Sequence, residues 1–256
     1  MRYLWLCCLF CAPVQGAQLQ WLDLGEIGGV PLQVLYAEAS AADAPVVVFN
    51  HGTGIRREGY QIGDQGNMDM AAYVTAFSEA GYTTYAPIRR FLHEEATKRR
   101  REIIGTAEQW QRVIELGVEV VQRAVRHARK GNAGRKIAVV GFSEGGLVSL
   151  WAAVADPGVD ALVMMSPAAL RAAEARSLRG ASIEAESLAM PVMLTLAEND
   201  HRRSMEIAST FLIPSLEKAG VPTSIQTGYR GRHATFHRVQ AAHIADVIEF
   251  LNQFIR

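Results

Sequence analysis

A serine between two glycines is the first feature of the chain with a clear chemical use. Residues Val139 to Leu147 have the sequence VVGFSEGGL, which places Ser143 in a Gly-x-Ser-x-Gly pattern. An apolar, strand-like run precedes this serine, and a helix-like run begins near Glu144. On such a strand-to-helix turn, small residues at positions 141 and 145 leave room for the turn and expose the hydroxyl as a nucleophile. Serine is also a favoured helix N-cap, so the motif alone leaves both interpretations open.

The sequence also supplies an acid and a base for this serine. A serine hydroxyl is un-ionised at neutral pH, so a nucleophile needs a base and a group that orients the base. Asp200 follows the apolar run Pro191 to Leu196, and His233 follows the run Ser224 to Tyr229. The chain order Ser, acid, His is the one expected of a hydrolase in which a strand-to-helix turn carries the nucleophile. We therefore predict that Ser143, Asp200 and His233 form a catalytic triad.

Each partner has a competitor nearby in the sequence. Glu198 is the alternative acid, and we favour Asp200 because it lies closer to the loop that follows the strand. His201 and His237 are the alternative bases. His201 adjoins the acid on the acid's own loop, and His237 is expected within the start of the final helix, so we expect both to lie at the surface or to support the site.

A fourth element precedes the serine in the chain. The apolar run Val46 to Phe49 leads into the sequence Asn50-His51-Gly52-Thr53-Gly54. Glycines there let backbone amides approach a reacting oxygen, and the amide of Glu144 lies at the positive end of its helix. We predict that the backbone N–H groups of Thr53 and Glu144 bind a developing oxyanion, with His51 as a structural residue beneath that loop.

With these motifs the chain resembles the α/β-hydrolase superfamily, from its first hairpin to its last helix. Ala197 to Asp200 is similar to the small-x-x-Asp ending of the family's acid strand, and Gly231 to Phe236 resembles the Gly-His-Ala-Phe segment of the dienelactone-hydrolase group, with insertions. Dienelactone hydrolases proper use a cysteine nucleophile. Ser143 is instead similar to the nucleophile of the esterase and serine-peptidase members.

The pattern of the remaining chain predicts the elements that must hold these residues. Residues Leu19 to Ala39 alternate apolar and polar around Gly28-Gly29, as in an antiparallel hairpin. After them, strand-like and helix-like runs alternate, which predicts a mostly parallel α/β sheet with helices on both faces and the hairpin at one edge. Further strands are predicted at Ala44–Gly52, Tyr82–Pro87, Lys136–Gly141, Ala161–Met165, Pro191–Leu196 and Ser224–Tyr229. Helices are predicted at Met68–Ala80, Ile103–Lys130, Glu144–Ala155, Ser204–Ala219 and Phe236–Ile255.

Composition limits the possible partners. Lys and Arg total 26 and Asp and Glu also total 26, and the aromatic residues do not interleave with one basic face. This balance argues against a nucleic-acid partner. No metal-ligand pattern such as His-Glu-x-x-His occurs in the sequence, so we predict neither a metal nor an organic cofactor. We expect a small-molecule ester as the substrate.

The first residues resemble an export signal. Arg2 precedes an apolar stretch from Tyr3 to about Ala12, and small residues at Gly16 and Ala17 suit a cleavage site. We predict a signal peptide at residues 1–17, a secreted or periplasmic protein, and no stable membrane insertion after cleavage. The alternative is a signal anchor that is retained. The three cysteines, Cys7, Cys8 and Cys11, all lie in this segment, so the mature chain is predicted to contain no disulfide.

Two irregular stretches and one long connection surround the predicted site. Ile55 to Asn67 and the charged run Arg89 to Arg101 both follow strands, so both are placed where they could line a site. We expect the charged run to be a solvated loop and the start of a helix, with anion recognition as the alternative. Ala168 to Ala189 is too short for a cap domain, so residues 18–256 are predicted to be a single α/β-hydrolase domain with an open site. Such a site favours soluble short-acyl or aryl esters.

The sequence therefore predicts a serine hydrolase that cleaves carboxylic esters through an acyl-enzyme. The first alternative is a serine peptidase of the prolyl-oligopeptidase type, whose catalytic domain has the same architecture. The second alternative is a non-catalytic binding protein on the same fold. The sequence makes no prediction of oligomeric state.

Overall fold

Eight strands form one mixed sheet in the computed structural model, which describes residues 17–52, 68–89, 107–131, 134–168 and 185–256. The strands are β1 (Gln20–Ile27), β2 (Val30–Ala37), β3 (Val46–Asn50), β4 (Thr83–Pro87), β5 (Ile137–Phe142), β6 (Ala161–Met165), β7 (Val192–Asn199) and β8 (Thr223–Arg232). The helices are α1 (Met70–Glu79), α3 (Ala107–Gly131), α4 (Glu144–Ala155), α6 (Arg202–Ile207), α7 (Ile213–Ala219) and α8 (Ala241–Ile255). A π-helix, η1 (Ala208–Leu212), and a 3-10 helix, η2 (His233–His237), complete the described elements.

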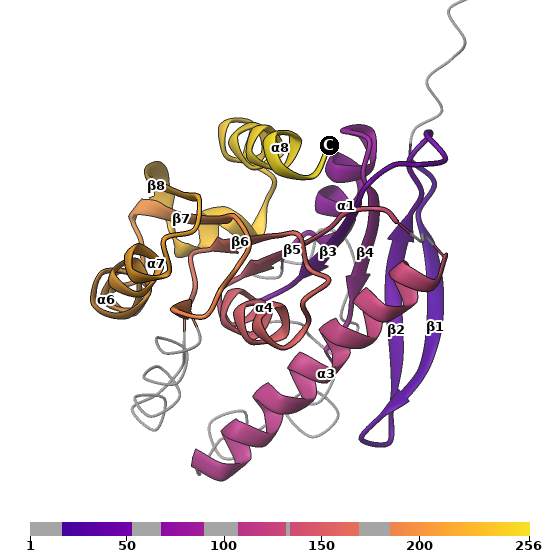
Figure 1. Cartoon of the computed structure of the whole chain (residues 1–256), viewed down its shortest axis with the longest axis horizontal. Helices are drawn as coiled ribbons and strands as arrows, with labels where there is room; N and C mark the ends of the chain where they lie inside the picture. The colour runs from indigo at the N-terminus through magenta and orange to yellow at the C-terminus, as the bar shows by residue number, and fades with distance from the viewer. Residues whose placement is uncertain (1–16, 53–67, 90–106, 132–133, 169–184) are drawn as a thin grey trace, which may run out of the picture.

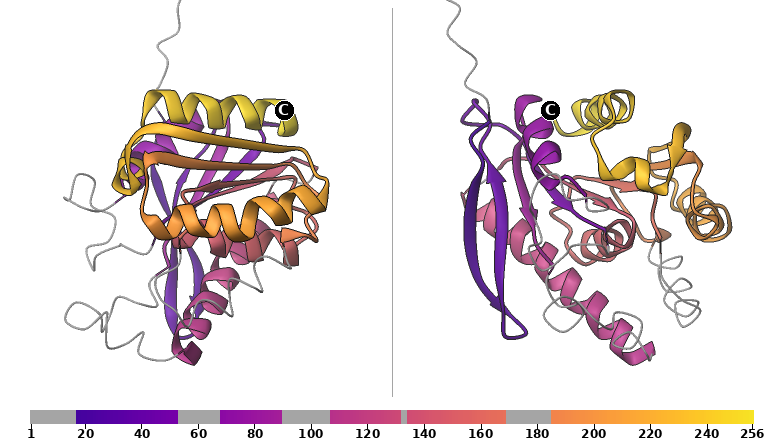
Figure 2. Two further views of the ribbon diagram at one scale, coloured as in Figure 1. Left: turned by 90° about the vertical axis from the view of Figure 1, so that its left-hand side faces the viewer. Right: turned by 180° about the vertical axis from the view of Figure 1, so that it is seen from behind.

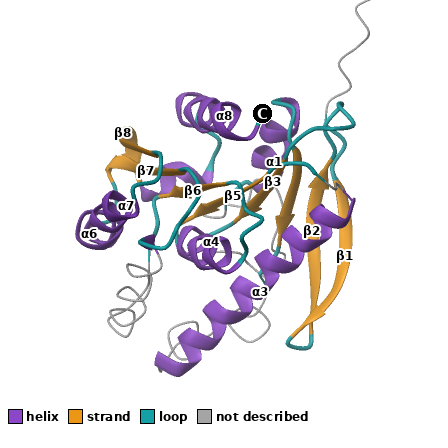
Figure 3. Ribbon diagram, in the orientation of Figure 1, coloured by secondary structure: helices purple, strands orange, loops and turns teal. Residues whose placement is uncertain are grey.

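The strand order is β1-β2-β4-β3-β5-β6-β7-β8. β1 and β2 pair antiparallel and form the edge that Figure 3 shows, whereas the strands from β4 to β8 pair parallel. The predicted α/β-hydrolase fold, with a mostly parallel sheet and an N-terminal antiparallel hairpin, is thus confirmed. β3 has β4 on one side and β5 on the other. The direction in which successive strands are added to the sheet therefore reverses at β3. In open α/β sheets such a switch point places a ligand site beside the carboxyl ends of the strands.

Helices cover both faces of the sheet, as predicted. α1 and α8 lie on one face, and α3, α4 and the α6–α7 segment lie on the other (Figures 1 and 2). Alternating side chains of the central strands supply the two cores. In β3, for example, Val46 and Val48 belong to the cluster with α3 and α4, whereas Val47 and Phe49 belong to the cluster with α1 and α8. The central strands are mostly apolar because both of their faces are covered.

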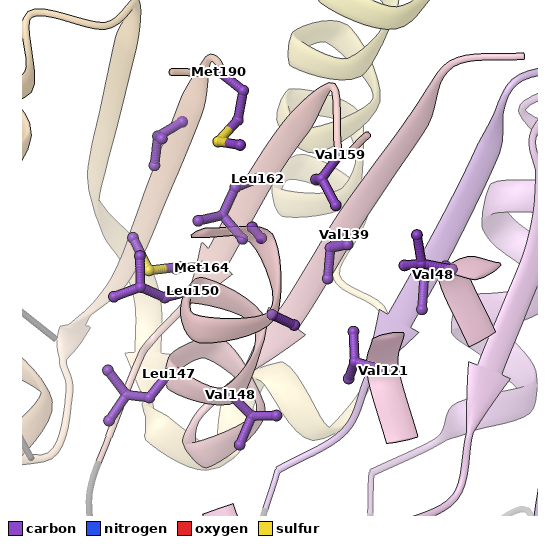
Figure 4. Packing of buried hydrophobic residues seen from close by; sticks show 14 of the residues in the cluster. Val48, Val121, Val139, Leu147, Val148, Leu150, Val159, Leu162, Met164 and Met190 are labelled. Atoms are coloured by element: carbon purple, nitrogen blue, oxygen red, sulfur yellow. The ribbon is translucent and has the colours of Figure 1, made fainter. Parts of the chain in front are cut away.

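Helix α4, which begins beside Ser143, is anchored in the core. Its residues Leu147, Val148 and Leu150 are fully buried and lie over the sheet close to Val139 and other strand residues (Figure 4). Fully burying one such side chain contributes about 1.5–3 kcal/mol of transfer free energy. The start of α4 is therefore held rigidly against the sheet.

Two helical segments near the C-terminus differ from their predictions. The final α-helix begins at Ala241 and not near Phe236, because residues from His233 to His237 form the separate 3-10 helix η2. The helix predicted at Ser204–Ala219 is interrupted by the π-turn η1. Pro214, which has no N–H, stands in the first turn of α7 directly after η1 and accounts for the local change in hydrogen bonding.

No helix among the described residues is both long and apolar enough to cross a membrane. Residues 1–16, which hold nearly all of the predicted signal peptide, lie outside the described residues. Most of the connection between β6 and β7 (residues 169–184) lies outside them too.

A buried histidine in α8 gives the fold a predicted pH dependence. The His243 ring packs edge-on against Tyr229 and Phe236, and its Nδ1 has no hydrogen-bond partner among the described residues. Burial lowers the pKa of His243 to about 4, against a smaller opposing effect of Asp246. Between pH 6.5 and 4 the unfolded chain therefore binds a proton at this position that the folded chain does not, so stability falls as pH falls through this window.

We expect His243 to lower the free energy of unfolding by about 2 kcal/mol between pH 7 and pH 5. His243→Gln removes this titration but keeps a polar group beside Thr195, whose Oγ1 lies 3.2 Å from His243 Nε2. Urea unfolding of both proteins at the two pH values measures the difference. Equal losses of stability in the wild type and the variant would contradict the assignment.

Candidate active site

The predicted triad residues come together at the carboxyl ends of three strands. Ser143 follows β5, Asp200 follows β7, and His233 follows β8. The β5 end lies next to β3, where the order of the chain reverses. The site therefore lies at the place in the sheet where ligands of open α/β folds bind.

Ser143 occupies a strained backbone conformation. Its φ of 55° and ψ of −125° lie in a region that residues with a side chain rarely adopt. Such a conformation costs about 1–3 kcal/mol and persists only where the surrounding structure holds it. The Ser143 N–H donates to Met165 O at 2.9 Å, and Ser143 O accepts from Gly146 N–H at 2.9 Å. The side chain makes no helix-capping hydrogen bond, so the cap interpretation has no support in the geometry.

The two flanking glycines are required by close packing. A β-carbon at Gly141 would overlap the backbone of Gly145 and the Ser149 hydroxyl in α4. A β-carbon at Gly145 would overlap the carbonyl oxygens of Asn50 and His51. Gly141 therefore allows α4 to pack closely against the end of β5, and Gly145 allows the segment that leaves β3 to pack closely against α4.

Ser143, His233 and Asp200 form a continuous hydrogen-bonded chain. His233 Nε2 lies 2.9 Å from Ser143 Oγ, and His233 Nδ1 lies 2.9 Å from Asp200 Oδ1. Because a carboxylate can only accept, the ring proton belongs on Nδ1, which leaves the Nε2 lone pair free to accept the serine proton. The arrangement has the geometry that a general base needs.

Asp200 is held as a carboxylate by several donors. Its Oδ1 accepts from His201 N–H at 2.6 Å, and its Oδ2 accepts from Ala197 N–H at 3.0 Å and from the Ser166 hydroxyl. Burial by itself raises the pKa of Asp200, but the hydrogen bonds from His233, Ser166 and the Ala197 amide outweigh it, and the pKa lies below its usual value. The competing acid Glu198 is exposed and forms no part of this chain.

Two serines that the sequence analysis did not single out support the acid and the base. Ser166 follows β6, is fully buried, and has a φ of 49°. Its Oγ donates to Asp200 Oδ2 and lies 2.8 Å from His233 Nδ1, while Ser204 Oγ lies 3.3 Å from the same nitrogen. Only the position of Ser166 directly after a predicted strand could have indicated it.

Ser166→Ala is expected to lower kcat/KM about tenfold, because it removes one hydrogen bond to a charged group. Alanine keeps the β-carbon, so the backbone strain at this position does not change. The steady-state rate of ester hydrolysis measures the effect, with Ser204→Ala as the matched control. Ser204 Oγ has only the longer contact with His233 Nδ1, at 3.3 Å, so Ser204→Ala should cost less activity. A larger loss in the Ser204 variant than in the Ser166 variant would contradict the role given to Ser166.

The alternative bases have other roles. His201 is the N-cap of α6, and its Nδ1 accepts from Arg203 N–H at 3.2 Å. His237 lies in η2 and its carbonyl accepts from Asp69 N–H at 2.8 Å, which ties η2 to the start of α1. Burial, with the nearby His233 and Arg238, lowers the pKa of His237. Neither ring takes part in a described hydrogen bond with Ser143.

The predicted oxyanion donors are described only in part. Glu144 is the first residue of α4, where backbone N–H groups have no acceptor within the helix. Thr53 lies outside the described residues, so its role stays a prediction.

The side chain of Arg89 corrects one expectation. Arg89, predicted to begin a solvated loop and helix start, is buried instead: its guanidinium pairs with Glu144 and donates to Asn50 Oδ1 at the end of β3. The rest of the charged run lies outside the described residues. In the described part of the chain, no three His, Cys, Asp or Glu side chains lie close enough together to hold a metal ion.

Comparison with solved structures identifies relatives of the fold. A dienelactone hydrolase from Anabaena variabilis is 18% identical, with a TM-score of 0.66 over 94% of this chain and 100% of that chain. An esterase from Pyrococcus furiosus is 16% identical, with a TM-score of 0.69 over 94% and 92% of the two chains. An acylaminoacyl peptidase from Pyrococcus horikoshii is 15% identical, with a TM-score of 0.69 over 94% of this chain and 42% of that one. At these identities the likeness shows the fold alone.

Comparison of sequences identifies the family. A search of curated proteins finds no significant match. The sequence model of the dienelactone hydrolase family, in contrast, matches residues 32–249. This match extends from β2 to α8 and includes Ser143, Asp200 and His233. The chain therefore belongs to the dienelactone hydrolase family.

Proposed function

We propose that this protein is a serine hydrolase that cleaves carboxylic esters through an acyl-enzyme. The observation that carries the proposal is the hydrogen-bonded chain from Ser143 Oγ through His233 to Asp200, with both His233 contacts at 2.9 Å. Membership of a hydrolase family and the likeness to an esterase fold support it. The nucleophile is an oxygen and not the sulfur of dienelactone hydrolases proper.

In the proposed mechanism, Ser143 Oγ attacks the acyl carbon while His233 Nε2 accepts the hydroxyl proton. Asp200 stabilises the imidazolium that forms and holds the ring in position. The amides of Glu144 and Thr53 bind the oxyanion. His233 then returns the proton to the leaving alcohol, and a water molecule activated by His233 releases the acid and regenerates the serine. No step requires a metal or an organic cofactor.

The second candidate is a serine peptidase, supported by the likeness to the acylaminoacyl peptidase fold. We rank it second because the family model that matches this chain is that of the dienelactone hydrolases. The chain spans 42% of the length of the peptidase. The predicted export signal supports a further proposal, that the ester substrate is encountered outside the cytoplasm.

Two assays test the proposal on the mature protein. A fluorophosphonate should label Ser143, as identified by peptide mass spectrometry, and p-nitrophenyl acetate should be hydrolysed. Faster cleavage of aminoacyl amides than of matched esters would favour the peptidase. A protein that is neither labelled nor active would favour a non-catalytic binding function and contradict the proposal.

A further inference from the structure

A buried ion pair joins the end of β4 to the first residue of α4, directly beside Ser143. Arg89 Nη1 donates to Glu144 Oε1 at 2.8 Å, and the two side chains are only 5% and 1% exposed. Moving two charges out of water carries a large desolvation cost, so a buried pair is a poor source of net stability. Glu144 Oε2 has no partner among the described residues, which adds to that cost. The pair therefore needs an explanation other than stability.

The other donors of Arg89 hold the segment that leaves β3. Arg89 Nε donates to Asn50 Oδ1 at 2.8 Å. Its Nη2 donates to the carbonyl of His51 and, at 3.3 Å, to that of Gly52. One guanidinium thus contacts a side chain and two successive carbonyls of this segment as well as the first residue of α4.

The Gly52 carbonyl is held from a second side. The backbone N–H of Arg89 donates to His51 Nε2 at 2.9 Å, so the His51 ring proton is on Nδ1, which lies 2.6 Å from Gly52 O. Arg89 and His51 together therefore hold the Gly52 carbonyl in one position.

Asn50 completes the connection between strand β3 and helix α4. Its Nδ2 donates to Gly145 O at 2.9 Å and to Ser149 Oγ at 3.2 Å, both in α4. The end of β3 and the start of α4 are thus joined directly by Asn50 and a second time through Arg89 and Glu144.

We propose that Arg89 is a positioning residue of the active site: it holds the Gly52 carbonyl and the start of α4, whose Glu144 amide is the predicted oxyanion donor, in one fixed relative geometry. This inference rests on the proposed serine-hydrolase function. Oxyanion donors accelerate acyl transfer only when they are fixed in place before charge develops. The planar fork of arginine suits this task because it reaches several acceptors at once, whereas lysine presents a single point charge on a flexible stem.

The inferred role depends on geometry more than on charge. Glu144 balances the charge of Arg89, so the pair contributes little net field at Ser143. Glu144→Gln keeps an oxygen that accepts from Arg89 Nη1, and it should therefore cost less activity than Arg89→Lys, which keeps the charge and loses the fork.

Arg89→Lys tests the inference through kinetics counted per active site. Complete labelling with a fluorophosphonate gives the concentration of intact sites. Per site, we expect kcat for p-nitrophenyl acetate to fall about 100-fold, and the Ki of phenylboronic acid, whose tetrahedral adduct mimics the oxyanion, to rise by a similar factor. KM and the midpoint of the pH profile should stay close to those of the wild type, because Arg89 contacts neither His233 nor Asp200 in the described structure.

Arg129→Lys is the matched control, since Arg129 pairs with Asp156 at 3.1 Å, on a half-exposed part of the molecule away from the site. It should change neither kcat nor Ki. A melting temperature that falls in Arg89→Lys while kcat per site and Ki stay unchanged would overturn the inference. Should that variant not fold, Glu144→Ala decides, because it removes the acceptor of Arg89 Nη1 and keeps the backbone amide of residue 144. Parallel changes in kcat and Ki support the inference, and unchanged kcat and Ki overturn it. A wild-type protein that the fluorophosphonate does not label would contradict the proposed function itself.

Discussion

Ser143→Ala is expected to lower kcat/KM for p-nitrophenyl acetate by at least about 10⁴-fold, because the loss of a triad nucleophile leaves only binding and oxyanion stabilisation. The substitution removes one oxygen atom and keeps the β-carbon, so the strained backbone at φ 55° and the packing of α4 should not change. The melting temperature should therefore stay close to that of the wild type. Steady-state rates, fluorophosphonate labelling and a thermal melt measure the three quantities on the same preparation.

Ser209→Ala supplies the comparison for this experiment. Ser209 is an exposed serine in η1 whose Oγ lies 3.5 Å from Glu206 O, so its loss should leave both rate and labelling unchanged. If Ser143→Ala kept more than about 1% of the activity, another nucleophile would have to be responsible, since a triad without its nucleophile does not retain such a rate.

The sequence predicted the sheet and the triad partners for the same physical reason. β-strands buried on both faces are continuous apolar runs, and the polar residue that follows such a run lies at the carboxyl end of the strand. Ser143, Asp200 and His233 each follow a run of apolar or alternating strand residues, so their convergence could be expected from topology. The glycines at 141 and 145 added the local requirement for close packing.

The supporting residues could not be predicted in this way. Ser166 follows β6 like many ordinary serines, and its contact with Asp200 depends on a left-handed backbone conformation that the sequence does not announce. Arg89 begins a run of charged residues, and charged runs are usually solvated, so only the three-dimensional structure shows its guanidinium buried against Glu144. Side-chain burial at a strand end depends on packing between elements distant in the chain.

Asp200→Asn is expected to lower kcat/KM about 10⁴-fold, although the side chain changes by a single polar group. All of the groups around the carboxylate can donate: His233 Nδ1 and His201 N–H face Oδ1, and Ala197 N–H and the Ser166 hydroxyl face Oδ2. An amide nitrogen on the Oδ2 side would oppose the Ala197 N–H. An amide nitrogen on the Oδ1 side would instead favour the tautomer in which His233 carries its proton on Nε2.

That tautomer has no lone pair to accept the proton of Ser143, and a neutral amide cannot stabilise an imidazolium in either orientation. Glu198→Gln is the matched control, because Glu198 is exposed two residues before Asp200 and should retain wild-type activity. Ester hydrolysis and the rate of fluorophosphonate labelling should fall together in the Asp200 variant, since both begin with attack by Ser143. The opposite pattern, with activity lost in Glu198→Gln and kept in Asp200→Asn, would transfer the role of the triad acid to Glu198.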